Sequence, residues 1–118
     1  KRKGIIVGIS SVAASKVYRG QGVYSGSKAY MEAFTKAIAA EYSKKGIRSN
    51  CVAPGSIDAG AMKKLAFFDK EDVIQLNPAG RTGTPQEVAE AVYFLCSDNS
   101  SFVNGTVLRV DGGHWLGV

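Results

Sequence analysis

Residues 4–10 read Gly-Ile-Ile-Val-Gly-Ile-Ser, an unbroken apolar run rather than the alternating pattern of a half-buried strand. Such a run predicts a β-strand that is covered on both faces, and strands of this kind occur mainly in parallel sheets. Parallel neighbours need crossover connections, which are usually helical. This segment therefore favours an α/β fold.

Two helices and two further strands follow in alternation. Apolar residues at helical spacing predict a long amphipathic helix that ends near Gly46, and Thr84-Pro85-Gln86-Glu87 has the form of a capping box with proline at the first helical position. The predicted elements after the first strand are a helix over 23–45, a strand over 48–53, a helix over 85–97 and a strand over 106–110. Weaker patterns predict short helices over 61–67 and 69–76.

The order strand, helix, strand, helix, strand corresponds to two right-handed crossover units. It predicts three parallel strands with helices packed on the sheet, which is the carboxyl-terminal half of a Rossmann-like, doubly wound fold. Ligands of such folds bind beyond the carboxyl ends of the strands. Residues 10–22, residues 54–62 and the segment after Val110 are therefore the places where a site is expected.

Composition excludes several other classes of protein. The 118 residues are 45% hydrophobic and 21% charged, which is typical of one globular domain. The net charge is +5, but the basic residues are scattered and are not interleaved with aromatic ones, so we expect no dedicated nucleic-acid binding. No apolar run approaches the roughly 20 residues of a membrane helix, and none resembles a signal peptide. We therefore predict a soluble, cytoplasmic protein that does not bind membranes.

Cysteine and histidine are too few and too far apart for a metal site. Cys51 and Cys96 are predicted to be reduced core thiols rather than a redox pair. His114 is the single histidine, so it cannot take part in a histidine cluster, and it is predicted to be a loop residue. We expect no bound metal.

Tyr24 and Lys28 lie four residues apart at the start of the long predicted helix, so their side chains share one face. An isolated tyrosine has a pKa of about 10 and is a poor acid at neutral pH, but a neighbouring ammonium stabilises the phenolate. Ser10 and Ser11 end the first strand, where one hydroxyl could meet the tyrosine oxygen. Alone, such a pair more often represents ordinary solvated surface than a site.

Five motifs, in this order along the chain, make a site the better interpretation of the Tyr24–Lys28 pair. Together they resemble the motifs of the short-chain dehydrogenase/reductase family, and the resemblance covers essentially the whole chain. The motifs are the strand ending at Ser10-Ser11, Tyr24-Ser25-Gly26-Ser27-Lys28, Asn50-Cys51-Val52-Ala53-Pro54-Gly55, Gly80-Arg81-Thr82-Gly83-Thr84-Pro85 and Val110-Asp111-Gly112-Gly113. The resemblance implies an NAD(P)-dependent oxidoreductase that interconverts an alcohol and a carbonyl.

The resemblance also implies roles for individual residues. Tyr24 would donate or accept the proton, Lys28 would support it and bind the nicotinamide ribose, and Ser11 rather than Ser10 would be the catalytic serine. Pro54 and Gly55 would let the backbone approach the nicotinamide, and Ile57 would bind its carboxamide through main-chain groups. Asp58 and Ala59 stand where the family commonly has a threonine, which departs from its pattern.

The family's glycine-rich dinucleotide-binding segment would precede Lys1, so residues 1–118 are expected to be the carboxyl-terminal half of one domain, and the choice between NAD and NADP is not readable. Residues 12–22 and 56–68 would line the substrate pocket, with an apolar component suited to steroids, acyl thioesters, quinones or sugar derivatives. The pocket's expected apolar residues are Tyr18, Met62, Leu65, Phe67 and Phe68. Arg81 could touch an anionic group or anchor a loop.

Two functional hypotheses remain open at this point. In the first, the chain is part of an enzyme acting on a small alcohol or carbonyl substrate. In the second, it is a catalytically incompetent half-domain that pairs its bare strand edge with a partner or a second copy. Under either hypothesis, the resemblance implies a homo-oligomer formed through the helix over residues 23–45.

Overall fold

The computed structural model describes residues 3–60 and 77–116. Its regular elements follow the predicted alternation, and short 3₁₀ turns adjoin several of them. They are β1 (Gly4–Ile9), α1 (Gly22–Tyr42), β2 (Ile47–Pro54), α3 (Pro85–Cys96) and β3 (Val107–Val110). The short helices predicted over 61–67 and 69–76 lie outside the described residues.

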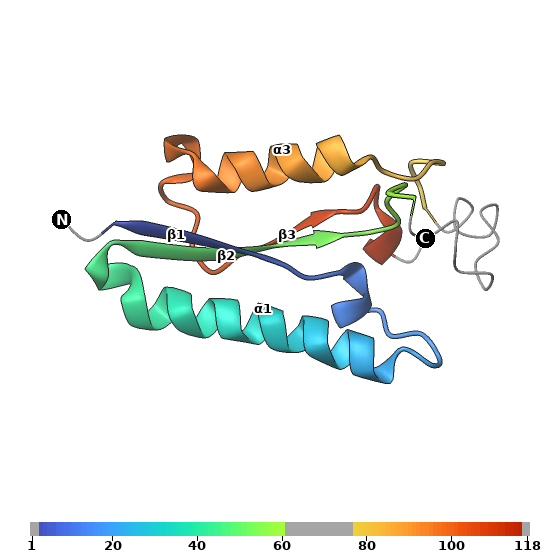
Figure 1. The fold of residues 1–118 in the computed structure, drawn as a ribbon, viewed down its shortest axis with the longest axis horizontal. Coiled ribbons are helices and arrows are strands. Elements are labelled where there is room, and N and C mark those ends of the chain that lie inside the picture. The colour runs from blue at the N-terminus through green and yellow to red at the C-terminus, as the bar shows by residue number, and fades with distance from the viewer. Residues whose placement is uncertain (1–2, 61–76, 117–118) are drawn as a thin grey trace.

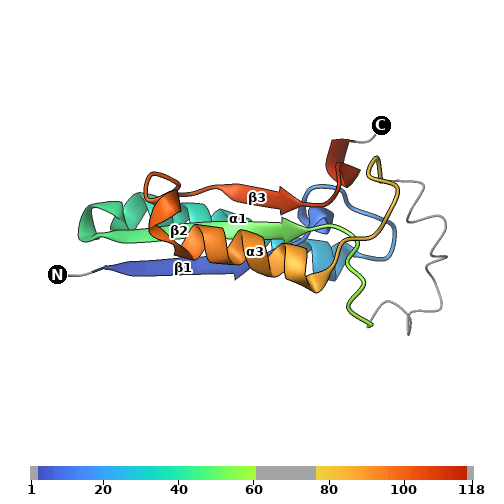
Figure 2. The same cartoon turned by 90° about the horizontal axis from the view of Figure 1, so that it is seen from above.

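The three strands form one parallel sheet in the order β1-β2-β3. In the register, Gly4 to Ile9 of β1 face Ile47 to Val52 of β2, and Cys51 to Pro54 of β2 face Val107 to Val110 of β3. α1 covers one face of the sheet and α3 covers the other (Figures 1 and 2). The prediction of a Rossmann-like α/β fold with three parallel strands and crossover helices is thus confirmed.

The core is centred on β2, because this strand has a hydrogen-bonded neighbour on each side and a helix on each face. Cys51, Val52 and Ala53 are at most 1% exposed, and Leu95 of α3 packs fully buried on the sheet. Gly8 of β1 allows α1 to approach closely, since a Cβ atom there would lie 2.9 Å from the sulfur of Met31. This close packing fixes α1, with its first turns, against the end of β1.

β1 differs from its prediction as a strand covered on both faces. Ile5, Ile6 and Ile9 remain 43%, 48% and 42% exposed. β1 lies at an edge of the sheet, so in the described part of the chain only β2 pairs with it. The apolar run therefore predicted the strand correctly, but its burial is incomplete.

The predicted helix ends are close to those observed. α1 ends at Tyr42 and continues as the 3₁₀ turn Ser43–Lys45, after which Gly46 adopts the left-handed conformation with φ of 80°. At the start of α3, the Thr84 hydroxyl accepts a hydrogen bond from the Glu87 N–H, and the Glu87 carboxylate accepts one from the Thr84 N–H. The capping box predicted from the sequence is therefore present.

Replacing Thr84 with alanine should remove one half of this capping box. We expect Thr84→Ala to lower the free energy of unfolding by about 1 kcal/mol, because the Glu87 N–H loses the side-chain acceptor of the cap and keeps only the Thr84 carbonyl. Denaturant unfolding followed by circular dichroism measures the change. Thr84→Ser keeps the hydroxyl and should stay close to the wild type; an equal loss in both variants would contradict the capping role.

Two predictions about single residues were wrong. Cys51 is a buried thiol as predicted, but Cys96 is exposed, because it is the last residue of α3 and follows the buried Leu95 on a different face. His114 is buried rather than a loop residue: it begins the 3₁₀ turn His114–Leu116 and is 6% exposed. The Asp111 carboxylate accepts from the N–H groups of Gly113 and Trp115, which turns the chain back and carries the histidine inward.

Among the helices in the described part of the chain, none combines the length and the apolar character required to cross a bilayer.

Candidate functional site

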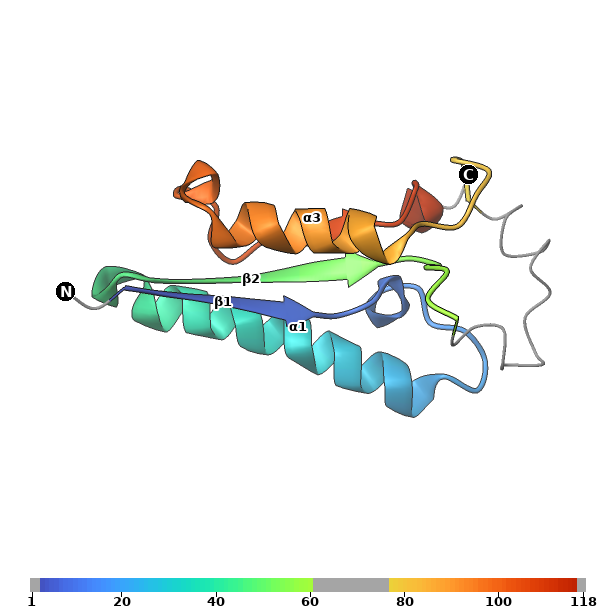
Figure 3. The ribbon, with the colours of Figure 1, turned by 45° about the horizontal axis from the view of Figure 1, so that its top comes forward.

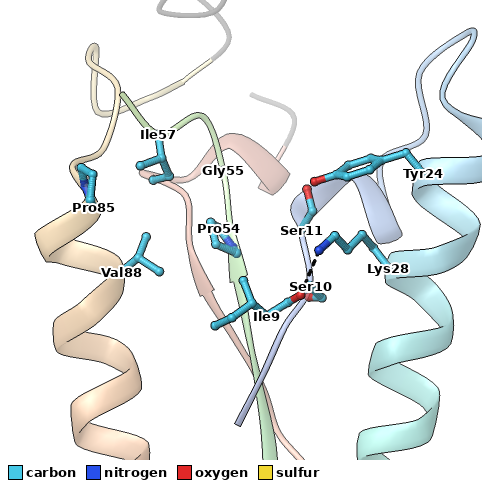
Figure 4. A pocket seen from close by; sticks show the side chains of 10 residues that line it. All are labelled: Ile9, Ser10, Ser11, Tyr24, Lys28, Pro54, Gly55, Ile57, Pro85 and Val88. Carbon is cyan, nitrogen blue, oxygen red and sulfur yellow. Dashed lines mark hydrogen bonds between the residues drawn. The ribbon is translucent and has the colours of Figure 1, made fainter. Parts of the chain in front are cut away.

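The carboxyl ends of β1 and β2 and the first turns of both helices line one cavity. These ends lie at the right-hand side of the ribbon in Figure 3. The cavity volume is about 400 Å³, within the range of small-molecule sites. Side chains from β1, α1, β2 and α3 contribute to its walls (Figure 4). The lining residues are Ile9, Ser10, Ser11, Tyr24, Lys28, Pro54, Gly55, Ile57, Pro85 and Val88.

Ser11 and Tyr24 bring two hydroxyl groups to the same side of the cavity. Ser11 follows β1 in extended conformation, and its Oγ accepts a hydrogen bond of 3.1 Å from the Ala13 N–H, which holds the serine at the start of a 3₁₀ turn. Tyr24 lies in the first turn of α1 and is 48% exposed. Figure 4 shows the two hydroxyls pointing toward one another.

Lys28 lies one helical turn after Tyr24, as the spacing predicts. Its Nζ donates a hydrogen bond of 3.1 Å to the Ile9 carbonyl and lies 5.6 Å from the centre of the Tyr24 ring. An ammonium group has three N–H donors, so two remain for other acceptors after the bond to Ile9. The positive charge is thus fixed at the base of the cavity, beneath the two hydroxyls (Figure 4).

Pro54, Gly55 and Ile57 form the opposite wall, so the structure brings all of the predicted site residues together around one cavity. Gly55 donates from its N–H to the Val110 carbonyl at 3.0 Å. A Cβ atom at Gly55 would lie 2.8 Å from the Cβ and 2.9 Å from the Cα of Asp111, so only glycine fits where β2 and β3 end.

One of the two backbone polar groups of Ile57, its carbonyl, is already hydrogen-bonded within the chain. Its carbonyl accepts from the Ala59 N–H at 3.0 Å, and Ile57 forms an isolated parallel bridge with Gly83. Its N–H has no hydrogen-bond partner among the described residues. Main-chain recognition of a ligand at this position would therefore fall to the N–H.

Glu32 is a part of this region that the sequence did not single out. The buried Ser10 hydroxyl donates to its Oε1 at 2.7 Å, one turn below the contact between Lys28 and Ile9. Two hydrogen bonds therefore join the end of β1 to α1, and they fix the distance between the strand that leads to Ser11 and the helix that carries Lys28. Extending the four-residue spacing of Tyr24 and Lys28 by one more turn would have indicated Glu32.

We expect Glu32→Ala to destabilise the fold by about 1 kcal/mol, because the buried Ser10 hydroxyl loses its carboxylate acceptor and keeps only the longer contact of 3.5 Å to the Val52 carbonyl. Glu32→Gln keeps an amide oxygen as acceptor and should lose less than half as much stability. Thermal unfolding of both variants beside Glu41→Ala, an exposed position on the same helix, measures the difference. Equal stability of Glu32→Ala and Glu41→Ala would show that the contact is energetically unimportant.

Arg81 serves as a loop anchor. Its guanidinium pairs with both carboxylate oxygens of Glu87, at 2.6 and 3.0 Å. The hydrogen bonds from Arg81, followed by the backbone bond from Thr84, lower the pKa of Glu87 to about 2. Arg81 therefore attaches the segment before α3 to its first turn and does not line the cavity.

Only some of the residues predicted to line the substrate pocket are among the described residues. Met62, Leu65, Phe67 and Phe68 lie outside the described residues. Tyr18 is described, and its hydroxyl bonds to the ring of His114 at 2.7 Å rather than lining the cavity. The described cavity is therefore bordered on one side by Ser11, Tyr24 and Lys28. On the other side it is bordered by the segment 54–57 and the start of α3 (Figure 4).

Comparison with known proteins agrees with this arrangement. The family described as enoyl-(acyl carrier protein) reductase matches residues 1–114. The 3-oxoacyl-(acyl-carrier-protein) reductase FabG of Chlamydia trachomatis is 44% identical over 112 residues, which are 95% of this chain and 45% of that protein. FabG of Thermotoga maritima is 42% identical, with coverage of 96% and 46%, and nodulation protein G of Rhizobium meliloti is 41% identical with the same coverage.

A solved structure agrees as well. The crystal structure of a protein assigned as a betaketoacyl-ACP reductase superposes with a TM-score of 0.84 at 41% identity, covering 95% of this chain and 47% of that one. The chain spans about half the length of the curated relatives it matches. On the family match, the level of identity and the shared fold, the chain belongs to the short-chain dehydrogenase/reductase family.

Proposed function

We propose that this chain supplies the catalytic half of an NAD(P)-dependent oxidoreductase that interconverts an alcohol and a carbonyl. The observation that carries the proposal is the convergence of Ser11, Tyr24 and Lys28 on one side of a single cavity, although they come from a strand end and two turns of a helix. The catalytic roles rest on this geometry together with membership of the family.

The donor set of the cavity suits a nicotinamide riboside. In the described part of the chain, Lys28 has two uncommitted N–H groups for vicinal ribose hydroxyls, and the Ile57 N–H can donate to a carboxamide oxygen. The wall at Pro54 and Gly55 has no long side chain to obstruct a planar ring. The bound nicotinamide would supply or accept the hydride, and the chain would supply alignment and the proton.

During reduction, the substrate oxygen would lie between the two hydroxyls. Ser11 would donate a hydrogen bond that polarises the carbonyl, and Tyr24 would transfer its proton to the oxygen as hydride reaches the carbon. The fixed Lys28 charge would stabilise the phenolate left on Tyr24. Oxidation of the alcohol reverses these steps, with the phenolate as the base.

We propose a 3-oxoacyl thioester as the substrate class. The proposal draws on the FabG relatives, whose name describes reduction of this group on acyl carrier protein. Its carbonyl is a suitable acceptor for the Tyr24 proton. The neighbouring thioester and acyl chain would extend toward residues 12–22, because these join Ser11 to α1.

We further propose that residues 1–118 are the carboxyl-terminal half of one such domain and that the amino-terminal half pairs with β1. The support is the coverage of 45–48% of the FabG relatives and the exposed apolar edge at Ile5, Ile6 and Ile9. Intact mass and amino-terminal sequencing of the protein purified from its source would test this. A mature protein that begins at Lys1 and carries no further segment would contradict it.

The activity is tested on the protein purified from its source. Reduction of an acetoacetyl thioester is followed by the loss of reduced-nicotinamide absorbance, with NADH and NADPH compared. Saturable, cofactor-dependent turnover is the expected result. Tight cofactor binding without reduction of any 3-oxoacyl thioester would reject the substrate class and leave the family chemistry intact.

A half-domain without catalysis is the second candidate, and the bare β1 edge favours it. Such a protein would bind a partner or a second copy through Ile5, Ile6 and Ile9 and would bind no dinucleotide. Fluorescence titration with NADH and NADPH separates the two candidates, because saturable binding by the 118-residue chain would reject this one.

The outer face of α1 supports the proposal of a homo-oligomer. Tyr30 and Phe34 are 66% and 48% exposed, and their rings stack with centres 5.7 Å apart. Light scattering of Phe34→Lys beside the wild type tests this surface; a dimer or larger assembly that dissociates in the variant is expected, and an unchanged mass would exclude Phe34 from the interface.

A further inference from the structure

The segment that joins Ser11 to Tyr24 is attached at its middle to the carboxyl-terminal turn of the described chain. The Tyr18 hydroxyl and the His114 Nε2 share a hydrogen bond of 2.7 Å, and their rings meet edge to face with centres 6.3 Å apart. Lys16 adds a second attachment by donating from Nζ to the His114 carbonyl at 3.2 Å. These contacts join residues that are almost one hundred positions apart in the sequence.

His114 is placed to make this attachment by the sequence around it. Gly112 and Gly113 adopt left-handed conformations, with φ of 60° and 88°, and allow the sharp turn after β3. Asp111 then accepts from the N–H groups of Gly113 and Trp115, so the turn is held from both sides. The buried ring thereby faces the segment before α1 rather than solvent.

The position of Tyr18 matters because Ser11 and Tyr24 are the two ends of the segment it belongs to. We propose that Tyr18 and His114 form a latch that holds this segment in place, and that both are positioning residues for the carbonyl reduction proposed above, on which the inference rests. The latch acts through the backbone and touches neither the reacting atoms nor the cavity. Opening it would release the connection between the two hydroxyls and raise the conformational entropy that substrate binding must overcome.

The surroundings of the His114 ring favour its uncharged form. Burial, and after it the Lys16 ammonium, holds the pKa of His114 below its ordinary value, while Asp111 opposes this. Tyr18, Lys16 and Asp111 are the titratable groups that face the ring in the described residues, and the Arg109 guanidinium is held over Trp115 at 4.1 Å. The Nδ1 is buried with no partner among these residues, so a proton added there would favour release of the ring into water.

The sign of the pH dependence follows from this lowered pKa. An unfolded chain takes up a proton on this histidine below about pH 6.5, whereas the folded protein resists it. Stability from the latch is therefore complete above that pH and is lost as the pH falls toward the lowered pKa of the folded state. Acid should open the latch before it unfolds the sheet.

Trp115 provides a readout that does not depend on activity, because it follows His114 in the same turn. Its fluorescence, isolated by subtraction of Trp115→Phe, is recorded against pH in the full chain for wild type, Tyr18→Phe and His114→Gln. The wild type should show a step with its midpoint below pH 6.5. Tyr18→Phe should move the midpoint upward, because the ring loses its partner and gains water, and His114→Gln should abolish the step. A step that persists in His114→Gln overturns the latch.

Kinetics test the positioning role with Tyr93→Phe, an exposed tyrosine on α3, as the matched control. At neutral pH, Tyr18→Phe should lower kcat/KM for the thioester by about threefold to tenfold, equivalent to one net hydrogen bond, with unchanged affinity for the reduced nicotinamide. The fall of wild-type kcat/KM in acid should follow the fluorescence step. If the pH profile of Tyr18→Phe superimposes on that of the wild type, the positioning role is overturned. If the wild type has no reductase activity at all, the proposed function is rejected, and the fluorescence result alone decides whether the latch exists.

Discussion

Tyr24→Phe should abolish nearly all carbonyl reduction while the protein keeps its fold. The substitution removes one oxygen, which no described residue needs for a hydrogen bond, from a side chain that is 48% exposed. Loss of a positioned general acid lowers rates by about 10²–10⁴-fold, so kcat should fall by this factor. Steady-state reduction of a 3-oxoacyl thioester by NADPH or NADH measures it.

Tyr30→Phe is the matched control for this experiment. Tyr30 lies on the same helix, is 66% exposed and stacks on Phe34, so its hydroxyl can be removed without disturbing the site. Its kcat should equal that of the wild type. Cofactor affinity should survive in both variants, because Lys28 and Gly55 are unchanged. Full activity in Tyr24→Phe would show that the proton comes from another group.

The elements that could be predicted from the sequence are those determined by interactions between residues close together in the chain. The capping box at Thr84 and the left-handed Gly46 each mark a helix end through interactions within a few residues. The four-residue spacing of Tyr24 and Lys28 likewise needs only helical geometry to place both on one face. Ser11 joined them because the carboxyl end of β1 lies beside the start of its own crossover helix.

The features that sequence reasoning missed depend on contacts between distant segments. Glu32 looks like one more polar residue on a helix until Ser10 is found buried against it. We expected His114 to be a loop residue because nothing near it in the sequence reveals Tyr18, which lies 96 positions earlier and bonds to its ring. Exposure of Ile5 and Ile6 was missed for the same reason, since burial of a strand depends on which elements are beside it.

Lys28→Met should lower kcat/KM by about 10²–10³-fold, the loss typical of removing one preorganised electrostatic contact. Unlike Tyr24→Phe, it should also weaken binding of the reduced nicotinamide, because the ammonium is the proposed partner of the ribose hydroxyls. The fold should lose about 1 kcal/mol, since among the described residues the amine makes one hydrogen bond, to the Ile9 carbonyl.

The control is Lys36→Met, which makes the same change of charge at an exposed position two turns further along α1. Because both variants reduce the net charge of +5 by one, any difference between them comes from the place of the charge rather than its amount. We expect Lys36→Met to keep full turnover and cofactor affinity and Lys28→Met to lose both. That result would assign the Lys28 ammonium to the site.

Lys28→Arg adds a test of geometry. A guanidinium keeps the charge but cannot reproduce the tetrahedral donors of an ammonium, so the activity of Lys28→Arg should lie between those of Lys28→Met and Lys36→Met. Equal kinetics in Lys28→Met and Lys36→Met would remove Lys28 from the proposed chemistry.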